Sequence, residues 1–273
     1  MDIRTILVSI DAEAFSPALV NCAGKLAQRF GARLVGIAAA EPTLPYGALD
    51  GAVAITGAYA ADRADLEARL GGYENDFRAL VPHGIEADYR VILEPPTQSV
   101  VAAARSADLI VTGSHLDEGA ARQRALDPGE VVLTAGRPVL MVGAGVSEIN
   151  AKRIVVGWTD RREARRAVAD ALPFLEAASE VAVITVSEGD AAEEQASLAD
   201  LIAWLARHGV RARGAVRPSK GEVAATLAEA AAEHEADLII TGGYGHSRLR
   251  QWLLGGMTQQ LLASAGLSRF MSN

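Results

Sequence analysis

Glycines and arginines cluster near the end of the sequence, in the segment TGGYGHSRLRQWLLGGMT that runs from Thr241 to Thr258. Four of its glycines stand in two groups with nine residues between them: Gly242, Gly245, Gly255 and Gly256. Because glycine has no Cβ, it lets the backbone approach another group closely. Backbone N–H groups freed in this way, above all before a helix, bind anions such as phosphate. The chemistry expected of this segment is therefore phosphate binding.

Ordinary structural roles also explain these residues. Gly242 and Gly245 can end a strand in a tight turn, and Gly255 can cap a short helix formed by SRLRQWLL. Asp11 follows the first apolar run of the chain. It can likewise have a purely structural role, in an Asx-type turn or as a helix cap. The residue types alone leave both explanations open.

The glycine segment belongs to a chain that contains an internal repeat, in which two similar copies follow one another. ADLIVTGS at Ala107–Ser114 recurs as ADLIITGG at Ala236–Gly243, and RTILVSID from Arg4 has its counterpart in KRIVVGWT from Lys152. The sequence therefore predicts two similar domains, residues 1–145 and 151–273, joined by a polar linker at Gly143–Lys152. Two such domains are expected to pack as an intramolecular pseudo-dimer. Pairing of two whole chains stays open.

Apolar runs alternate with amphipathic stretches in each copy. In the first copy the amphipathic pattern predicts helices around these ranges: Pro17–Phe30, Ala61–Leu80, Thr97–Ala104 and Pro128–Ala135. Continuously apolar strands between helices indicate a parallel sheet covered on both faces. Five strands per copy predict two doubly wound α/β domains of the flavodoxin-like or Rossmann-like kind.

The first copy is longer than the second. The offset between the copies is 148 residues at the first strand but 125 at the HGI and HGV turns, His83–Ile85 and His208–Val210. The difference of 23 residues lies mostly in the apolar segment Glu41–Ala60, which we expect to be a loop. A loop of this length is usually functional or forms an interface, and the alternative is a flap packed on its own domain.

Charge distinguishes the two glycine segments. Residues 112–130 of the first copy carry four acids against Arg122 and Arg124, and Leu116 stands where a second glycine would fall. Residues 241–258 carry Arg248 and Arg250 and no acid. Carboxylates repel phosphate oxygens, so the second copy is the one expected to bind an anion.

A further run of arginines, DRREARRAV, follows the first strand of the second copy. It places four cations near the start of a predicted helix: Arg161, Arg162, Arg165 and Arg166. The helix dipole disfavours cations at this end, and a bound anion would offset that effect. The alternative is a solvated face on which these residues pair with Glu163 and Asp170.

The spacing Gly242, two residues, Gly245, nine residues, Gly255 resembles the glycine signature of the universal stress protein family, in its nucleotide-binding branch. The resemblance covers nearly the whole chain as a tandem of two domains. It implies the strand order 3-2-1-4-5, ATP, ADP or a related adenine nucleotide as ligand, and a role in the stress response. It leaves open whether Mg²⁺ accompanies the nucleotide.

The resemblance also implies which further residues take part. The family has Ser or Thr after the third glycine; this chain has Gly256 there, with the hydroxyl of Thr258 two residues on. The family has Asp at the end of the first strand. This chain has Thr159 there, followed by Asp160 as a candidate for the ribose, whereas Asp11 of the first copy falls in the expected place.

Composition narrows the class of protein. The formal net charge of −8 argues against a nucleic-acid partner. No apolar stretch approaches the roughly 18–20 residues of a membrane span, so we expect a cytoplasmic protein that stays off membranes. Cys22 is the one cysteine, and its helical spacing predicts a small core residue.

The sequence offers no familiar catalytic or metal-binding pattern. The chain contains no G-x-S-x-G, G-x-x-x-x-G-K-[ST] or H-E-x-x-H pattern, so we assign no catalytic residue and no metal ligand. Three functions remain: a stress-response protein that binds adenine nucleotide in its second domain, a nucleotide-free tandem scaffold, and a weak adenine-nucleotide hydrolase.

Overall fold

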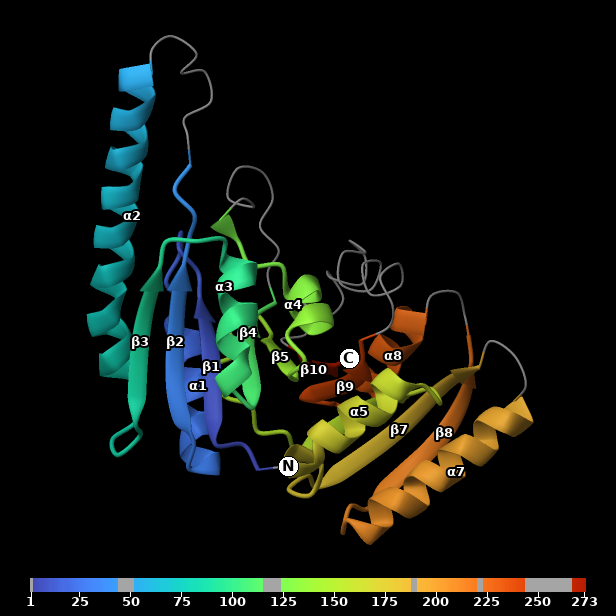
Figure 1. Cartoon of the computed structure of the whole chain (residues 1–273). Coiled ribbons are helices and arrows are strands. Elements are labelled where there is room, and N and C mark those ends of the chain that lie inside the picture. Colours follow the sequence, from blue (N-terminus) through green and yellow to red (C-terminus); the bar gives the residue numbers. More distant parts are fainter. Residues whose placement is uncertain (1, 44–51, 115–123, 188–190, 220–222, 244–266) are drawn as a thin grey trace.

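Ten strands form one sheet in the computed structural model, which describes residues 2–43, 52–114, 124–187, 191–219, 223–243 and 267–273 (Figure 1). The strands of the first half are β1 (Thr5–Ile10), β2 (Arg33–Ala39), β3 (Ala87–Ile92), β4 (Leu109–Gly113) and β5 (Val139–Val142). Those of the second half are β6 (Arg153–Trp158), β7 (Glu180–Ser187), β8 (Ala212–Pro218), β9 (Leu238–Gly242) and β10 (Ser268–Ser272).

Helices cover this sheet. Those of the first half are α1 (Pro17–Phe30), α2 (Ala52–Leu80), α3 (Pro96–Ala103), the short 3-10 helix η1 (Ala104–Ser106) and α4 (Pro128–Thr134). Those of the second half are α5 (Arg162–Asp170), α6 (Leu172–Leu175), α7 (Ala191–Arg207) and α8 (Val223–Glu233). None of the helices in the described ranges combines the length and the apolar content that crossing a bilayer requires.

The order of the strands is β3-β2-β1-β4-β5-β10-β9-β6-β7-β8. Each half thus has the order 3-2-1-4-5 and parallel pairing, which confirms the predicted doubly wound α/β fold. The two halves meet where β5 and β10 run antiparallel, with Leu140 opposite Phe270. One continuous sheet therefore joins the two halves.

Local signals explain the bounds of α1, which match the prediction. Pro17 occupies the first turn, where its missing N–H costs nothing. The hydroxyl of Ser16 accepts a hydrogen bond from the amide of Leu19, and Gly31 ends the helix with a φ of 62°. These two caps satisfy backbone groups that the helix itself leaves without partners.

Helix α2 begins nine residues before its predicted start at Ala61. It has 29 residues, which at 1.5 Å per residue makes it about 43 Å long. Its N-terminal part extends past the edge of the sheet (Figure 1). Residues 52–60 of the expected loop are thus helical, because their alanines favour helix. Residues 44–51 lie outside the described ranges.

The hydrophobic core is continuous on one face of the sheet and divided on the other. On the face covered by α1, α2, α5 and α7 a single buried cluster runs through both halves, and it contains Cys22. On the other face the two halves have separate clusters, one under α3 and α4 and one under α8. Burial of Cys22 agrees with its predicted place in the core.

Candidate functional site

The carboxyl edge of the second half brings together the ends of β6 and β9. These strands pair in parallel with Gly157 beside Thr241, so Thr159 and Asp160 follow β6 close to the place where β9 ends at Gly242. Strand order reverses between β6 and its two neighbours β7 and β9. Ligands of doubly wound sheets bind at such a point.

Gly242 lies directly against the first turn of α5. A Cβ on this residue would stand 2.5 Å from the amide nitrogen of Ala164 and 2.6 Å from the carbonyl carbon of Glu163. Only glycine leaves room for this backbone contact. Gly242 is therefore required by the close approach of α5. This differs from both roles that the sequence suggests, which are phosphate binding and a tight turn at the end of the strand.

Gly243 makes a similar contact with the first half. Its amide donates a hydrogen bond of 2.6 Å to the carbonyl oxygen of Ser272, and a Cβ would stand 2.8 Å from a methyl group of Val132 in α4. The end of β9 is thus wedged between α5 and α4. The candidate site borders both halves of the protein.

The N-terminus of α5 has no side-chain cap. Arg161 occupies the N-cap position and forms no capping hydrogen bond, in contrast to Ser16 at the start of α1. The side chain of Arg161 therefore gives the first amides of α5 no partner, and these amides carry the positive end of the helix dipole. This helix end is chemically suited to an anion.

Ion pairs hold most of the arginines of this helix. Nη2 of Arg162 lies 3.3 Å from Oε1 of Glu163, and Nε of Arg166 donates to Oδ2 of Asp170 at 2.9 Å. Both pairs were the alternative that the sequence offered for these residues. Arg161 is exposed and forms no ion pair with any residue in the described ranges.

Asp160 and Thr159 occupy the turn between β6 and α5. One carboxylate oxygen of Asp160 accepts hydrogen bonds from Nε and Nη2 of Arg165, at 2.9 Å and 2.6 Å. Both side chains of this pair are more than half exposed, so a ligand can reach them. The carbonyl oxygen of Thr159 accepts the amide of Arg161 at 2.7 Å, which closes the turn.

The remaining candidate residues of the second half are those of the later glycine segment. Gly245, Gly255, Gly256 and Thr258 lie outside the described residues. Their expected role at phosphate stays a prediction.

Asp11 has a structural task at the equivalent edge of the first half. Its carboxylate accepts hydrogen bonds from the amides of Glu13 and Ala14, at 2.7 Å and 3.1 Å. These bonds form an Asx-type turn, one of the two roles that the sequence left open. The carboxylate therefore stabilises the loop that leads to α1.

Arg124 crosses the same edge of the first half and ties its loops together. Its Nη2 donates to both carboxylate oxygens of Asp62 in α2 at 2.7 Å, and to the hydroxyl of Thr43 at 2.9 Å. Its Nη1 donates to Glu13 at 3.4 Å, and Glu13 also pairs with Arg69. Segments after β1, β2 and β4 are thus linked through one guanidinium.

This network shifts the ionisation of its members. Burial alone would raise the pKa of Asp62, but hydrogen bonds from Arg124 and from the Thr43 amide outweigh burial and hold that pKa below its usual value. Burial likewise opposes the charged form of Arg124, yet its bonds to Asp62 and Glu13 raise the pKa of Arg124. Both groups are therefore charged at neutral pH.

Sequence reasoning missed this network. In the sequence Arg124 is only one charge of a loop, and its partners lie 62 to 111 residues away. Nothing local in the sequence pairs them. These paired charges lie at the edge of the first half.

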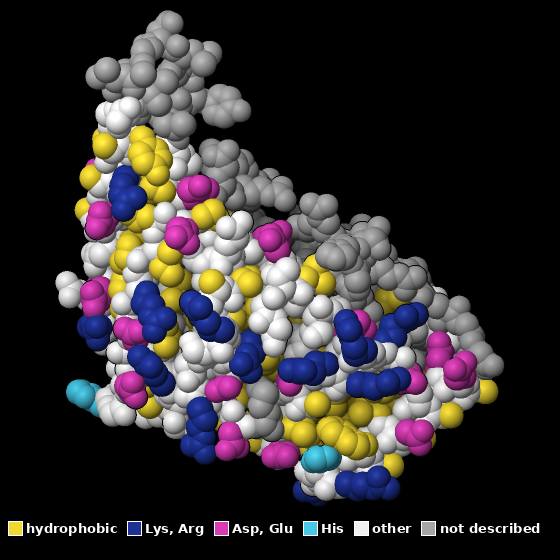
Figure 2. All heavy atoms as spheres, viewed as in Figure 1, with side chains coloured by type: hydrophobic (Ala, Val, Ile, Leu, Met, Phe, Trp, Pro, Cys, Tyr) yellow, Lys and Arg dark blue, Asp and Glu magenta, His cyan; other side chains and the backbone are white. Residues whose placement is uncertain are grey.

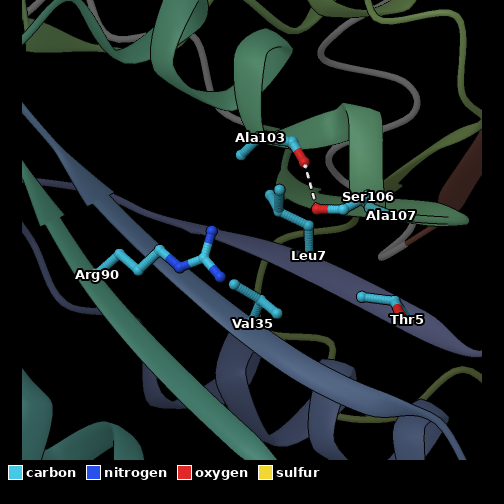
Figure 3. Close-up of a pocket in the computed structure, with 7 residues that line it drawn as sticks. All are labelled: Thr5, Leu7, Val35, Arg90, Ala103, Ser106 and Ala107. Atoms are coloured by element: carbon cyan, nitrogen blue, oxygen red, sulfur yellow. Dashed lines mark hydrogen bonds between the residues drawn. The ribbon is translucent and has the colours of Figure 1, made fainter.

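A small cavity lies elsewhere in the first half, between η1 and the sheet (Figure 3). Its volume is about 10 Å³. It is lined by Thr5, Leu7, Val35, Arg90, Ala103, Ser106 and Ala107. A space of this size holds about one water molecule, so it is no nucleotide site. Within the described ranges no group of three or more His, Cys, Asp or Glu side chains is placed to hold a metal ion.

Solved structures with the same fold span nearly the whole chain. A universal stress protein from Archaeoglobus fulgidus DSM 4304 covers 98% of this chain and 96% of its own, with a TM-score of 0.70 and 17% identity. A functionally unknown protein from Pseudomonas aeruginosa PAO1 covers 99% of this chain and 92% of its own, with a TM-score of 0.59 and 15% identity. The TM-scores of these two matches show a shared fold, and at such low sequence identity they show the fold alone.

A shorter protein matches half of the chain. It is a universal stress protein from Archaeoglobus fulgidus in complex with dAMP, which covers 51% of this chain with 19% identity and a TM-score of 0.32. A comparison with curated proteins gave no match. The model of the universal stress protein family matches twice, at residues 2–143 and 150–268. The chain therefore belongs to the universal stress protein family.

Proposed function

We propose that this protein acts in the stress response and binds ATP or a related adenine nucleotide at the carboxyl edge of its second half. Membership of the family and the glycine segment make adenine nucleotide the ligand to consider. The observation that carries the proposal is the uncapped, arginine-rich start of α5 against Gly242.

Phosphate fits the chemistry of this helix end. The N-cap residue Arg161 offers the first amides of α5 no side-chain acceptor, and a phosphate oxygen would supply one. Arg161 has no acidic partner among the described residues, so its charge is free to meet the phosphates. Gly255, Gly256 and Thr258 would complete the cradle, as the glycine signature implies.

Ribose fits the turn that precedes this helix. The carboxylate of Asp160 is exposed and keeps one oxygen outside its bonds with Arg165. That oxygen can accept a hydroxyl hydrogen of the sugar, while Arg165, which lies in α5 and contacts Asp160, can face the phosphates. Thr159 begins the turn directly after β6 and supplies a further hydroxyl.

The first half offers a poorer place for an anion. The carboxylates of Asp11, Glu13 and Asp62 lie along its edge, and the guanidinium of Arg124 is already held by two of them. The start of α1 is also capped by Ser16. The phosphates of a nucleotide would find a helix start that is already capped, and they would be repelled by the carboxylates at this edge. We therefore assign binding to the second half alone.

Calorimetric titration of the intact chain with ATP, ADP and AMP, with and without Mg²⁺, tests this proposal. Gly255→Val and Arg165→Glu should each weaken binding at least about tenfold, which corresponds to 1.4 kcal/mol. Arg63→Glu, at an exposed position of α2, should leave binding unchanged. Circular dichroism confirms that each variant is folded.

The other outcomes separate the alternatives. Unchanged affinity in both second-half variants removes the proposed site. A chain that binds none of the three nucleotides is a nucleotide-free scaffold. Slow, metal-dependent phosphate release that disappears in Asp160→Ala would favour the hydrolase.

A further inference from the structure

Charges are segregated along α7 and the turn that follows it. Residues 167–206 contain eight acids and no Lys, Arg or His. Residues 207–221 contain no acid and six basic residues: Arg207, His208, Arg211, Arg213, Arg217 and Lys220. In Figure 2, acidic side chains lie along the upper part of the outer edge formed by α7, and basic side chains lie at its lower end.

Three charges share one side of α7. Glu193, Asp200 and Arg207 are spaced by seven residues, which is two helical turns. All three are exposed, and none forms an ion pair with a residue in the described ranges. At this spacing they lie too far apart to pair with one another. We call this side of the helix the α7 charge face.

The opposite side of α7 holds the helix on the sheet. Leu198, Leu201 and Leu205 are buried, and Leu198 packs on Gly214 of β8. Figure 1 shows α7 as the outermost helix of the second half, with no described helix beyond it. Between the charges, the exposed side carries the small side chains of Ala199 and Ala203.

We propose that the α7 charge face binds the same face of a second copy of this chain. A twofold axis that relates antiparallel copies of α7 places Asp200 of each copy opposite Arg207 of the other. The same arrangement brings Glu193 of each copy near the basic turn at Arg211. Every contact occurs twice in such a dimer, and both signs of charge find partners. Ala199 and Ala203 let the helices approach closely.

Pairing through the edge strand β8 is disfavoured. Arg213 and Arg217 lie four residues apart in β8 and therefore share one face of the strand. Two antiparallel copies of β8 centred on Ala215 would set Arg213 of each copy opposite Arg217 of the other, and like charges in opposite positions destabilise a sheet. Charged side chains on an edge strand are a common protection against such pairing. The helix, not the strand, carries the complementary surface.

Sedimentation equilibrium of the intact chain tests this proposal independently of nucleotide binding. Exposed ion pairs are individually weak and screened by salt. At about 0.05 M salt we expect a monomer–dimer equilibrium that shifts to monomer at about 0.5 M, where the Debye length falls to about 4 Å. A chain that is monomeric at every concentration would overturn the proposal.

Charge exchange provides the decisive variants. Asp200→Arg and Arg207→Asp should each weaken the dimer at least about tenfold, because each places like charges together. The double variant exchanges the two charges and should return to within about threefold of the original chain. Arg63→Glu in α2 is the matched exposed control and should change nothing.

Two results would contradict the assignment of the partner. Equal dimerisation of the original chain and both single variants places the contact on another surface. A monomer that instead binds anionic lipid vesicles or a poly-glutamate peptide through Arg207 makes the basic turn a site for a different partner. Circular dichroism of each variant confirms that lost pairing is not lost folding.

Discussion

The ring of Phe30, the last residue of α1, packs edge to face on the ring of Phe174 in α6, with centroids 5.3 Å apart. Phe174 in turn lies 5.7 Å from Phe270 of β10. The guanidinium of Arg29 stands 5.7 Å from the centroid of Phe174. A helix of the first half and two elements of the second half thus share one aromatic cluster.

Phe174→Ala should destabilise both halves together. Loss of a fully buried phenylalanine costs about 3–5 kcal/mol, and here the cavity would border both halves. Urea unfolding followed by circular dichroism should show one transition at lower urea. Phe15→Ala, which removes a half-buried ring contact within the first half, should cost less. Two separate transitions, with the first half unaffected by Phe174→Ala, would show that the cluster does not couple the halves.

Gly242→Ala should be destabilising where Gly113→Ala is not. These glycines occupy equivalent places at the ends of β9 and β4, yet a Cβ meets the backbone of α5 at the first and open space at the second. Overpacking of this kind costs about 1–3 kcal/mol, whereas Gly113→Ala should stay within about 0.5 kcal/mol. Thermal unfolding of both variants measures the difference, and equal melting temperatures would contradict the contact with Ala164.

Arg124→Ala should lower stability at neutral pH but not in acid. The lowered pKa of Asp62 means that the network stabilises the fold above the ordinary Asp pKa of about 3.9 and stops doing so as the pH falls through the lowered value. We expect a loss of about 1–3 kcal/mol at pH 7 that shrinks below about pH 4.

Urea unfolding of both proteins between neutral and acidic pH measures this dependence. Arg63→Ala, on the exposed side of the same helix that holds Asp62, is the control. A loss of stability in Arg124→Ala that does not vary with pH would mean that packing of the arginine, not its charge, links the loops.

Cys22 should react with thiol reagents only when the protein unfolds. Burial raises the pKa of this thiol to about 12, with a smaller opposite effect from a backbone hydrogen bond at Ile149. The thiolate is the reactive form, so the native protein should stay unlabelled near pH 8. Labelling by a chromogenic disulfide at increasing urea should follow the unfolding curve. Rapid labelling without denaturant would show that this part of the core opens locally.

Local signals account for the parts of the fold that the sequence predicts well. Pro17 and Gly31 mark the ends of α1, and the repeat of ADLIVTGS as ADLIITGG places β4 and β9 at equivalent positions. The start of α2 was missed because the apolar, uncharged run after Ala52 shows no helical alternation of polar and apolar residues. A periodic pattern appears only where a helix packs on the sheet.

Contacts between distant residues account for what could not be predicted. Gly242 was recognised as important, but its contact with Ala164 depends on how closely α5 follows β6. The shorter turn of the second half, in which α5 begins three residues after Thr159, brings that helix against the strand end. The Arg124 network depends in the same way on three loops that meet only in the folded chain.

Equilibrium dialysis of the intact chain against labelled ATP measures how many nucleotides bind per chain. One nucleotide per chain is expected, since the second half presents an uncapped helix and arginines while acids and the Arg124 network cross the edge of the first. Asp11→Ala should leave that number at one. No bound nucleotide, or two per chain with one lost in Asp11→Ala, would contradict the assignment of binding to the second half.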